Sequence, residues 1–301
     1  MSLALLIDNP ERVRTTWPTE PVRSRRNPEE FADLLTLAEV DAWIDTGCLA
    51  MRNVSLLKEG IPVDPRVYED PGQPDMPRPG YLRRHLDEGG TLSVRSLERL
   101  KPTIAKLYDD LQHELGYTIH VNAYLTPGES QGLHYHYDPY VTAILQLNGS
   151  KEWPIHRPLV QDPTREWGGF KERRFTHEEM DYLAKTAPEM TFRLIPGDAF
   201  WLPRGYIHAP YTVGEEPSLH LTVAVKERTR YWLMGQLFDL ITEGSMADAD
   251  MRATVPPSGI ATDTERYVEE ARRVAMAALA TLDVPRAARS IRRACGSALL
   301  G

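Results

Sequence analysis

Apolar residues early in the chain recur at helical spacing behind two sets of capping residues. Residues 27–30 read Asn-Pro-Glu-Glu, which supplies an N-cap, a proline at the first helical position and a glutamate at the third. Residues 36–39 read Thr-Leu-Ala-Glu and repeat the capping box, and Gly47 stands where a second helix would end. The pattern predicts one helix from residue 28, with its apolar residues turned inward, and another from residue 37 to about residue 44.

Residues 61–90 are rich in proline and aspartate and keep no sustained period, so we expect an irregular connection around one or two short strands. Helical order returns at residues 97–115, where five apolar side chains share one face and Gly116 follows as a stop. The residues of that face are Ile104, Leu107, Tyr108, Leu111 and Leu115. Up to residue 116 the chain is therefore predicted to be helical with irregular connections.

Short stretches rich in β-branched and aromatic residues follow Gly116, with proline and glycine turns between them. They cover residues 117–125, 134–147, 152–155, 191–195, 199–202 and 219–225. Such a series predicts a β-sandwich or a β-barrel.

A helical period returns after residue 229. We expect a helix over residues 231–243, a capping box at residues 262–265 that opens a long alanine-rich helix to about residue 282, and a last short helix from Pro285. The first of these helices has a broad apolar face, formed by Tyr231, Leu233, Met234, Leu237, Leu240 and Ile241. That face suits either a partner subunit or the core of the chain itself.

Composition narrows the class of protein. With 301 residues, 42% of them apolar, the chain can bury a large core, and its formal net charge of -8 argues against a general polyanion binder. Two locally basic stretches, at residues 23–26 and 286–293, are interpreted as solvated faces because no aromatic residues are interleaved with them. We therefore expect no direct nucleic-acid binding.

The two cysteines, Cys48 and Cys295, lack metal-site spacing, so a disulfide framework is not expected and a reducing cytoplasm is the natural compartment. The apolar stretch in residues 1–8 is too short for a secretion signal, and no apolar run approaches the length that spans a membrane. We expect no membrane association.

Candidate metal chemistry begins at residues 134–138, which read His-Tyr-His-Tyr-Asp. On a strand, His134, His136 and Asp138 would point one way and the two tyrosines the other. An exposed polar face of an antiparallel strand would explain this pattern equally well. A second segment, residues 196–208, reads as a tight turn, a buried strand and a Pro-Arg-Gly turn that brings His208 back toward the sheet.

Two kinds of metal site could use these histidines. A four-ligand cupin site would take His134, His136, a glutamate four or five residues further on, and His208. Tyr140 and Val141 occupy the positions where that glutamate is required. A facial triad of two histidines and one carboxylate would take His136, Asp138 and His208, which leaves three open positions on a non-haem Fe(II) ion. The triad is complete in this sequence.

Five motifs in order resemble the JmjC-type cupin oxygenases, a family that includes the ribosomal oxygenases. They are Asn122-Ala-Tyr124-Leu-Thr126-Pro, Gly132 ahead of His136-Tyr-Asp138, residues 144–153 with Lys151 and Trp153, Gly197-Asp198 to His208, and Ser218-Leu-His220-Leu-Thr222. The resemblance covers about residues 27–282 and is most specific from 122 to 222. It implies an α+β fold with a double-stranded β-helix (jelly-roll) core at 117–228, an N-terminal helical and irregular region at 1–116, and a C-terminal helical region at 229–301.

When the family's functional residues are matched to this sequence position by position, the resemblance implies that His136, Asp138 and His208 bind Fe(II). It also implies that Lys151 pairs with the distal carboxylate of 2-oxoglutarate. A buried dicarboxylate needs a cation at the end away from the metal. The ordinary alternative for Lys151 is a solvated hairpin residue, because Asn-Gly-Ser precedes it. The resemblance also implies that Asn122 and Thr222 hydrogen-bond the cosubstrate, with Tyr124 as a further pocket residue.

Two more histidines have open roles. His134 departs from the family, whose members carry a small or apolar residue near this position. It could line the substrate pocket, donate a hydrogen bond to one of the metal ligands, or have a structural role. His220 could be a pocket wall or a packed polar residue. The remaining histidines have no partner pattern and are assigned no role; they are His85, His113, His120, His156 and His177.

The resemblance implies an Fe(II)- and 2-oxoglutarate-dependent dioxygenase that uses O₂ to hydroxylate an amino-acid side chain of a protein or peptide, with a ribosomal protein as one candidate. It also implies a homodimer through the helices after residue 229. Ribosomal oxygenases usually continue into a winged-helix domain, for which this sequence leaves no room, so a biosynthetic peptide or a small metabolite stays an alternative substrate. Two other classes remain: a cupin metal enzyme without 2-oxoglutarate, for which Lys151 would be dispensable, and a cupin-like binding protein. Substrate choice is expected to lie in loops such as residues 160–181.

Overall fold

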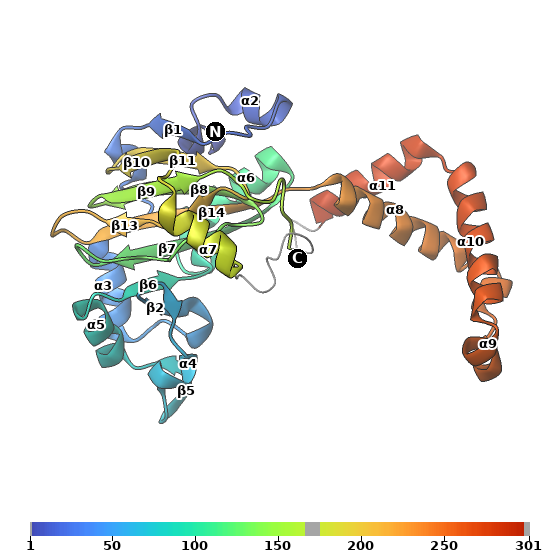
Figure 1. Cartoon of the computed structure of the whole chain (residues 1–301), viewed down its shortest axis with the longest axis horizontal. Coiled ribbons are helices and arrows are strands. Elements are labelled where there is room, and N and C mark those ends of the chain that lie inside the picture. The colour runs from blue at the N-terminus through green and yellow to red at the C-terminus, as the bar shows by residue number, and fades with distance from the viewer. Residues whose placement is uncertain (1, 166–174, 298–301) are drawn as a thin grey trace. The chain divides into compact units, whose positions relative to one another are not determined.

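A computed structural model describes residues 2–165 and 175–297 of the chain. The fold divides into two compact units, Met1–Glu227 and Arg228–Gly301, which are described separately (Figure 1). The three-part division at residues 116 and 228 stays a prediction from the sequence.

The first unit is built around an eight-stranded antiparallel sheet in the order β1-β11-β8-β14-β7-β6-β2-β3 (Figure 1). Its strands are β1 (Val22–Arg25), β2 (Val54–Lys58), β3 (Ile61–Pro62), β6 (Thr91–Val94), β7 (Thr118–Thr126), β8 (Val141–Asn148), β11 (Asp198–Leu202) and β14 (Ser218–Lys226). In the centre, Thr222 of β14 lies opposite Asn122 of β7 on one side and Ile144 of β8 on the other.

A smaller sheet lies against the large one. It contains β10 (Met190–Leu194), β9 (Lys151–His156) and β12 (Ile207–His208), and β13 (Tyr211–Thr212) also pairs with β9. Apolar side chains from both sheets form one buried cluster, made of Ile144, Trp153, Ile155, Leu194, Phe200, Leu202 and Tyr206. Two sheets that enclose such a core form a jelly roll, so the predicted α+β fold with a double-stranded β-helix core is confirmed.

The second face of the large sheet is covered by helices that precede β7, and a larger apolar core lies between the two layers. These helices are α1 (Leu3–Leu6), α2 (Pro10–Thr15), α3 (Leu37–Thr46), α4 (Pro65–Tyr68), α5 (Pro79–Asp87) and α6 (Pro102–Leu115). The predicted ends are confirmed, because Gly47 and Gly116 close α3 and α6 in the left-handed conformation. Both predicted capping boxes, at residues 27–30 and 36–39, form as well.

The sequence prediction was wrong about several elements before residue 116. The helix expected from residue 28 is one 3₁₀ turn, η1 (Pro28–Phe31). The connection expected at 61–90 contains short strands as predicted, β3 and the hairpin of β4 (Glu69–Asp70) and β5 (Gln73–Pro77), but it also contains the helices α4 and α5. Strands β2 and β6 were missed because they are short and because both of their faces are buried. Short 3₁₀ turns also lie at η2 (Met51–Asn53) and η3 (Leu97–Arg99), and one helix, α7 (His177–Lys185), interrupts the strands.

The second unit is helical. It contains α8 (Arg230–Ser245), η4 (Asp250–Arg252), α9 (Pro257–Thr262), α10 (Thr264–Ala280) and α11 (Val284–Ser297). The capping box predicted at residues 262–265 does not form, because Thr262 ends α9 and the Asp263 side chain makes no cap hydrogen bond. Within residues 2–165 and 175–297, no helix has the length and apolar character that a membrane crossing requires.

Candidate active site

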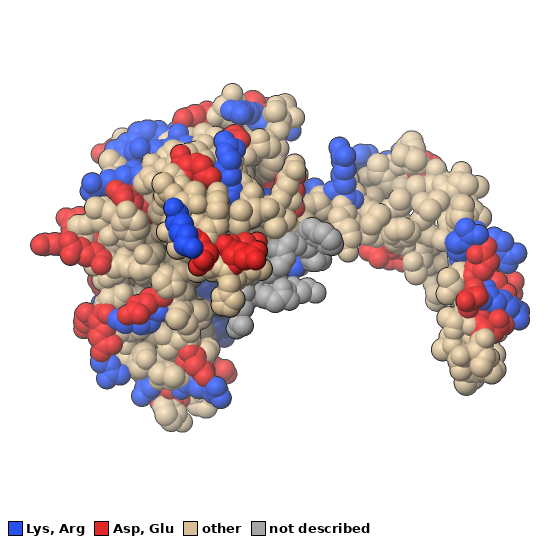
Figure 2. Space-filling model, in the orientation of Figure 1, with Lys and Arg blue, Asp and Glu red and all other residues tan. Residues whose placement is uncertain are grey.

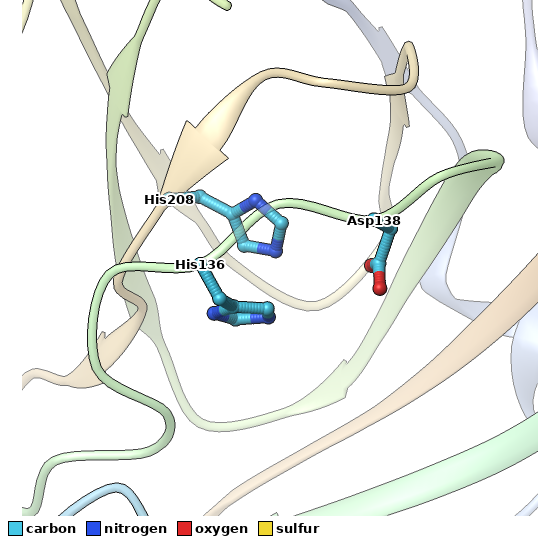
Figure 3. A group of neighbouring side chains, drawn as sticks. All are labelled: His136, Asp138 and His208. Atoms are coloured by element: carbon cyan, nitrogen blue, oxygen red, sulfur yellow. The ribbon is translucent and has the colours of Figure 1, made fainter. Parts of the chain in front are cut away.

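His136, Asp138 and His208 come together at one end of the jelly roll (Figure 3). One ligand atom from each residue lies within 4.8 Å of the other two. The backbones of His136 and His208 exchange two hydrogen bonds, with N···O distances of 3.1 and 2.8 Å, and Gly205 N–H donates to the Asp138 carbonyl at 2.9 Å. The backbone thus fixes all three Cα positions before any metal binds.

Each imidazole of the triad has one nitrogen close to a backbone carbonyl. His136 Nδ1 lies 2.7 Å from the His134 carbonyl, and His208 Nδ1 lies 2.9 Å from the Tyr206 carbonyl. A ring that donates Nδ1–H to a carbonyl presents the lone pair of Nε2, which is the form a metal binds. Burial, with the neighbouring His136 as a second cause, lowers the pKa of His208 to about 3 and keeps this ring neutral.

The Asp138 carboxylate is held by a side chain that the sequence did not single out. Thr142 Oγ donates to Asp138 Oδ2 at 2.9 Å. Thr142 lies inside β8, where β11 and β14 pair with it on both sides, and its side chain is buried. One carboxylate oxygen is therefore occupied by a hydrogen bond, and the other is left for a metal ion.

The expected alternation along residues 134–138 was wrong. Strand β8 begins only at Val141, and the preceding segment is a loop with a single bridge between His136 and His208. Without a continuous ladder nothing enforces a period of two, so His134 turns to the surface. A Cβ at Gly60 would lie 2.6 Å from the His134 ring. His134 therefore packs on Gly60, outside the cavity that it was expected to line, and the four-ligand alternative loses a ligand.

A cavity extends from the triad to Lys151. Its lining comprises Leu57, Thr91, Tyr124, Gly132, Leu133, His136, Asp138, Thr142, Lys151, Trp153, His208, Pro210, His220 and Thr222. The metal-ligating triad and the primary amine of Lys151 therefore line the same cavity. Part of the loop predicted to choose the substrate, residues 166–174, lies outside the described residues.

Lys151 is the first residue of β9, and only 1% of its surface is exposed. Its Nζ donates to Thr126 Oγ at 2.8 Å, and Thr126 Oγ lies 3.0 Å from Thr91 Oγ. No carboxylate of the described residues forms an ion pair with it, and burial lowers the pKa of Lys151 to about 7. Because Lys151 is buried, its interpretation as a solvated hairpin residue is wrong. Burying an amine without an anionic partner costs free energy of folding.

The other predicted pocket residues divide into two groups. Tyr124, Thr222 and His220 line the cavity, and the His220 ring stacks on Tyr124 with centroids 5.2 Å apart. Burial lowers the pKa of His220 well below its ordinary value, so the ring is neutral. Asn122 is outside the lining, and its Oδ1 accepts a hydrogen bond from Ser96 N–H at 3.1 Å.

A jelly roll that carries two histidines and one carboxylate facing a cavity defines the cupin class of metal-site proteins. Residues 96–233 match the family described as "JmjC domain". The core of the chain therefore resembles a JmjC domain, and several relatives are similar to it over a longer stretch.

Ribosomal oxygenase 1 of Rattus norvegicus is 33% identical over 224 residues, 72% of this chain and 35% of that protein. A bifunctional lysine-specific demethylase and histidyl-hydroxylase NO66 of Aedes aegypti is 26% identical over 80% of this chain and 37% of its own length. The chain spans between about a third and a half of the curated relatives first matched. The ribosomal oxygenase YcfD of Escherichia coli, solved with cobalt and 2-oxoglutarate, shares the fold with a TM-score of 0.53 at 18% identity, over 91% of this chain and 67% of that one.

Proposed function

We propose that this protein is an Fe(II)- and 2-oxoglutarate-dependent oxygenase that hydroxylates an amino-acid side chain of a protein or peptide. The observation that carries the proposal is the buried Lys151 amine, which lines the same cavity as the triad. A metal site alone would fit many cupins. A metal site and a buried cation in one cavity fit a ligand with two acidic ends.

The donor set suits a divalent iron ion. His136 and His208 would each supply a neutral nitrogen and Asp138 one oxygen, on one face of the ion, which leaves positions for other ligands. Thr142 would hold the second Asp138 oxygen away from the ion. Bound iron supplies the redox chemistry by which O₂ oxidises 2-oxoglutarate to succinate and carbon dioxide and inserts oxygen into a C–H bond.

The cavity also suits 2-oxoglutarate. Its keto-acid end would lie at the triad and its distal carboxylate would accept from Lys151, whose charge that carboxylate would neutralise. Tyr124 and Thr222 offer hydroxyls on the same wall, and Trp153 with Leu57 supplies apolar surface that excludes water. We propose Lys151, Tyr124 and Thr222 as cosubstrate residues; Asn122, which the resemblance also implied, lies outside the cavity lining and accepts a hydrogen bond from Ser96 N–H.

The kind of substrate rests on the relatives. Two are named for action on ribosomal proteins or on histidyl and lysyl residues, which supports a protein side chain as the hydroxylated group. A biosynthetic peptide or a small metabolite remains the second candidate, because the triad and Lys151 would hold the metal and the cosubstrate whatever the hydroxylated group is. The cytoplasm is proposed as the compartment, because the sequence has only two cysteines, which lie far apart and lack metal-site spacing.

We also propose a homodimer through the helical unit. Large apolar side chains of α8 are unusually exposed there, among them Tyr231, Leu233, Met234 and Phe238. Ile241 and Ala287 are the buried apolar residues that the described part of this unit contributes. A helical unit with so small a core of its own gains stability when a second copy covers this face.

The test is succinate formation from 2-oxoglutarate by anaerobically Fe(II)-loaded protein after exposure to oxygen. We expect slow turnover even without a hydroxylation substrate, abolished in His136→Ala and in Lys151→Met. Succinate formation that survives Lys151→Met would refute the proposed role of Lys151 in holding 2-oxoglutarate. If no succinate forms, and calorimetry also detects no binding of 2-oxoglutarate to the metal-loaded protein, the proposal is refuted.

A further inference from the structure

The last helix of the described chain carries an arginine face that the proposed oxygenase chemistry does not use. Between Val284 and Ser297 the sequence contains four arginines and no acidic residue, although the whole chain has a formal charge of -8. The four are Arg286, Arg289, Arg292 and Arg293, and all are exposed. None of them forms an ion pair with a described residue.

Helical spacing gathers these arginines on one side. At about 100° per residue, Arg286, Arg289 and Arg293 fall within an arc of about 60° and extend over about 10 Å of helix axis, with Arg292 at the edge of the same side. Ala287 lies on another side of the helix and is buried, and the α11 backbone contacts α8. The arginine face therefore points away from the packed side of α11.

The neighbouring helix α10 shows how arginines are arranged where they only solvate and stabilise a helix. There Arg266 pairs with Asp263 and Glu270, and Arg272 pairs with Glu269. Positive and negative side chains are interleaved along α10 (Figure 2). The contrast between two helices of one unit shows that the charge on α11 is segregated.

Helix stability does not account for this segregation. Cations stabilise the last turn of a helix, where they meet the negative end of the macrodipole, and they are unfavourable in the first. Arg286 stands in the first turn of α11, where the helix would favour an acidic residue. An unpaired row of guanidinium groups in this position is instead suited to bind a ligand with closely spaced negative charges.

We propose that the arginine face of α11 binds the phosphodiester backbone of a nucleic acid. A duplex presents about one negative charge for every 1.7 Å of its axis, so a 10 Å row of arginines meets several phosphates at once. The described residues of α11 include no aromatic side chain to stack on bases, which makes backbone contacts without sequence preference the expected mode. A membrane surface fits less well, because the apolar side of the helix is turned toward α8.

This inference revises the sequence-based expectation of no direct nucleic-acid binding, and it does not depend on the oxygenase activity.

The experiment measures the fluorescence anisotropy of a labelled RNA duplex and of a labelled DNA duplex as the full chain is added, over a series of salt concentrations. The variant replaces Arg286, Arg289 and Arg293 by Gln, and the matched control replaces Arg266, Arg272 and Arg273 of α10 by Gln. Glutamine has nearly the helix propensity of arginine, so both variants should fold, which circular dichroism checks.

We expect the wild type to bind at low salt, and the α11 variant to bind at least about tenfold more weakly, with a salt slope smaller by about 3, or about 1 for each arginine. The α10 variant should keep both the affinity and the slope. Preference for RNA over DNA, or equal binding, would identify the source of the phosphates. Equal losses in the two variants, no binding by the wild type, or binding to anionic vesicles alone would overturn the proposal.

Discussion

Replacing Lys151 by methionine should stabilise the free protein while it destroys the cosubstrate site. Burial lowers the pKa of Lys151 from 10.5 to about 7. At roughly 1.4 kcal/mol for each pKa unit, burial of the charged amine lowers the free energy of unfolding by about 5 kcal/mol. Methionine has a similar length and no charge, so Lys151→Met removes that cost and loses the hydrogen bond to Thr126, about 1 kcal/mol.

The dependence on pH identifies the cause. Below about pH 7 the amine is charged in both the folded and the unfolded chain, and the full cost of burial is present. Between pH 7 and 10.5 the folded chain holds a neutral amine while the unfolded chain binds a proton, so the stability of the wild type rises with pH. The advantage of Lys151→Met should therefore be several kcal/mol near about pH 6 and should shrink toward zero near about pH 10.

Urea denaturation of metal-free protein at about pH 6 and about pH 9 measures both quantities. Lys106→Met is the control, because this lysine is exposed and pairs only with Asp110 on the helix surface. It should change the free energy of unfolding by less than about 1 kcal/mol at either pH. A Lys151→Met variant that is less stable than the wild type at about pH 6, or equally shifted at both pH values, would refute the reasoning.

Three further predictions follow from the site and the helical unit. Thr142→Val removes the hydroxyl that holds Asp138 and keeps the shape of the side chain. Calorimetry should show that Co(II) binds about tenfold more weakly or worse to this variant, and that Thr142→Ser restores the affinity. An unchanged affinity would make Thr142 a packing residue. Saturating Co(II) should raise the melting temperature of the wild type and leave His208→Ala unchanged, and equal shifts would place the metal elsewhere. Phe238→Glu should convert a dimer to monomers in sedimentation experiments, whereas a wild type that is already monomeric would contradict the proposed interface.

The sequence predicted the longer strands that follow Gly116 to within a few residues, except that β8 begins at Val141, and it also predicted that the three residues of the triad lie together. His136, Asp138 and His208 could be found because imidazole and carboxylate are metal ligands wherever they stand, and a motif order points to them. Thr142 could not be found, since a threonine inside a strand is ordinary and only the folded chain shows that its hydroxyl meets Asp138. The same holds for Thr126, whose contact with Lys151 joins two strands that are 25 residues apart in the chain.

The three residues of the triad do lie together, but the local rule from which their arrangement was predicted does not hold. Alternation along a strand was expected to bring His136 and Asp138 to one face, yet neither residue belongs to β8. Their places are set by bonds to a distant segment, from Gly205 N–H to Asp138 and between the backbones of His136 and His208. A side chain next to such a segment follows no period, which is why His134 turns away from the cavity. The local sequence therefore indicates which residues are metal ligands. Their arrangement in space depends on contacts with distant segments, which a short sequence motif does not reveal.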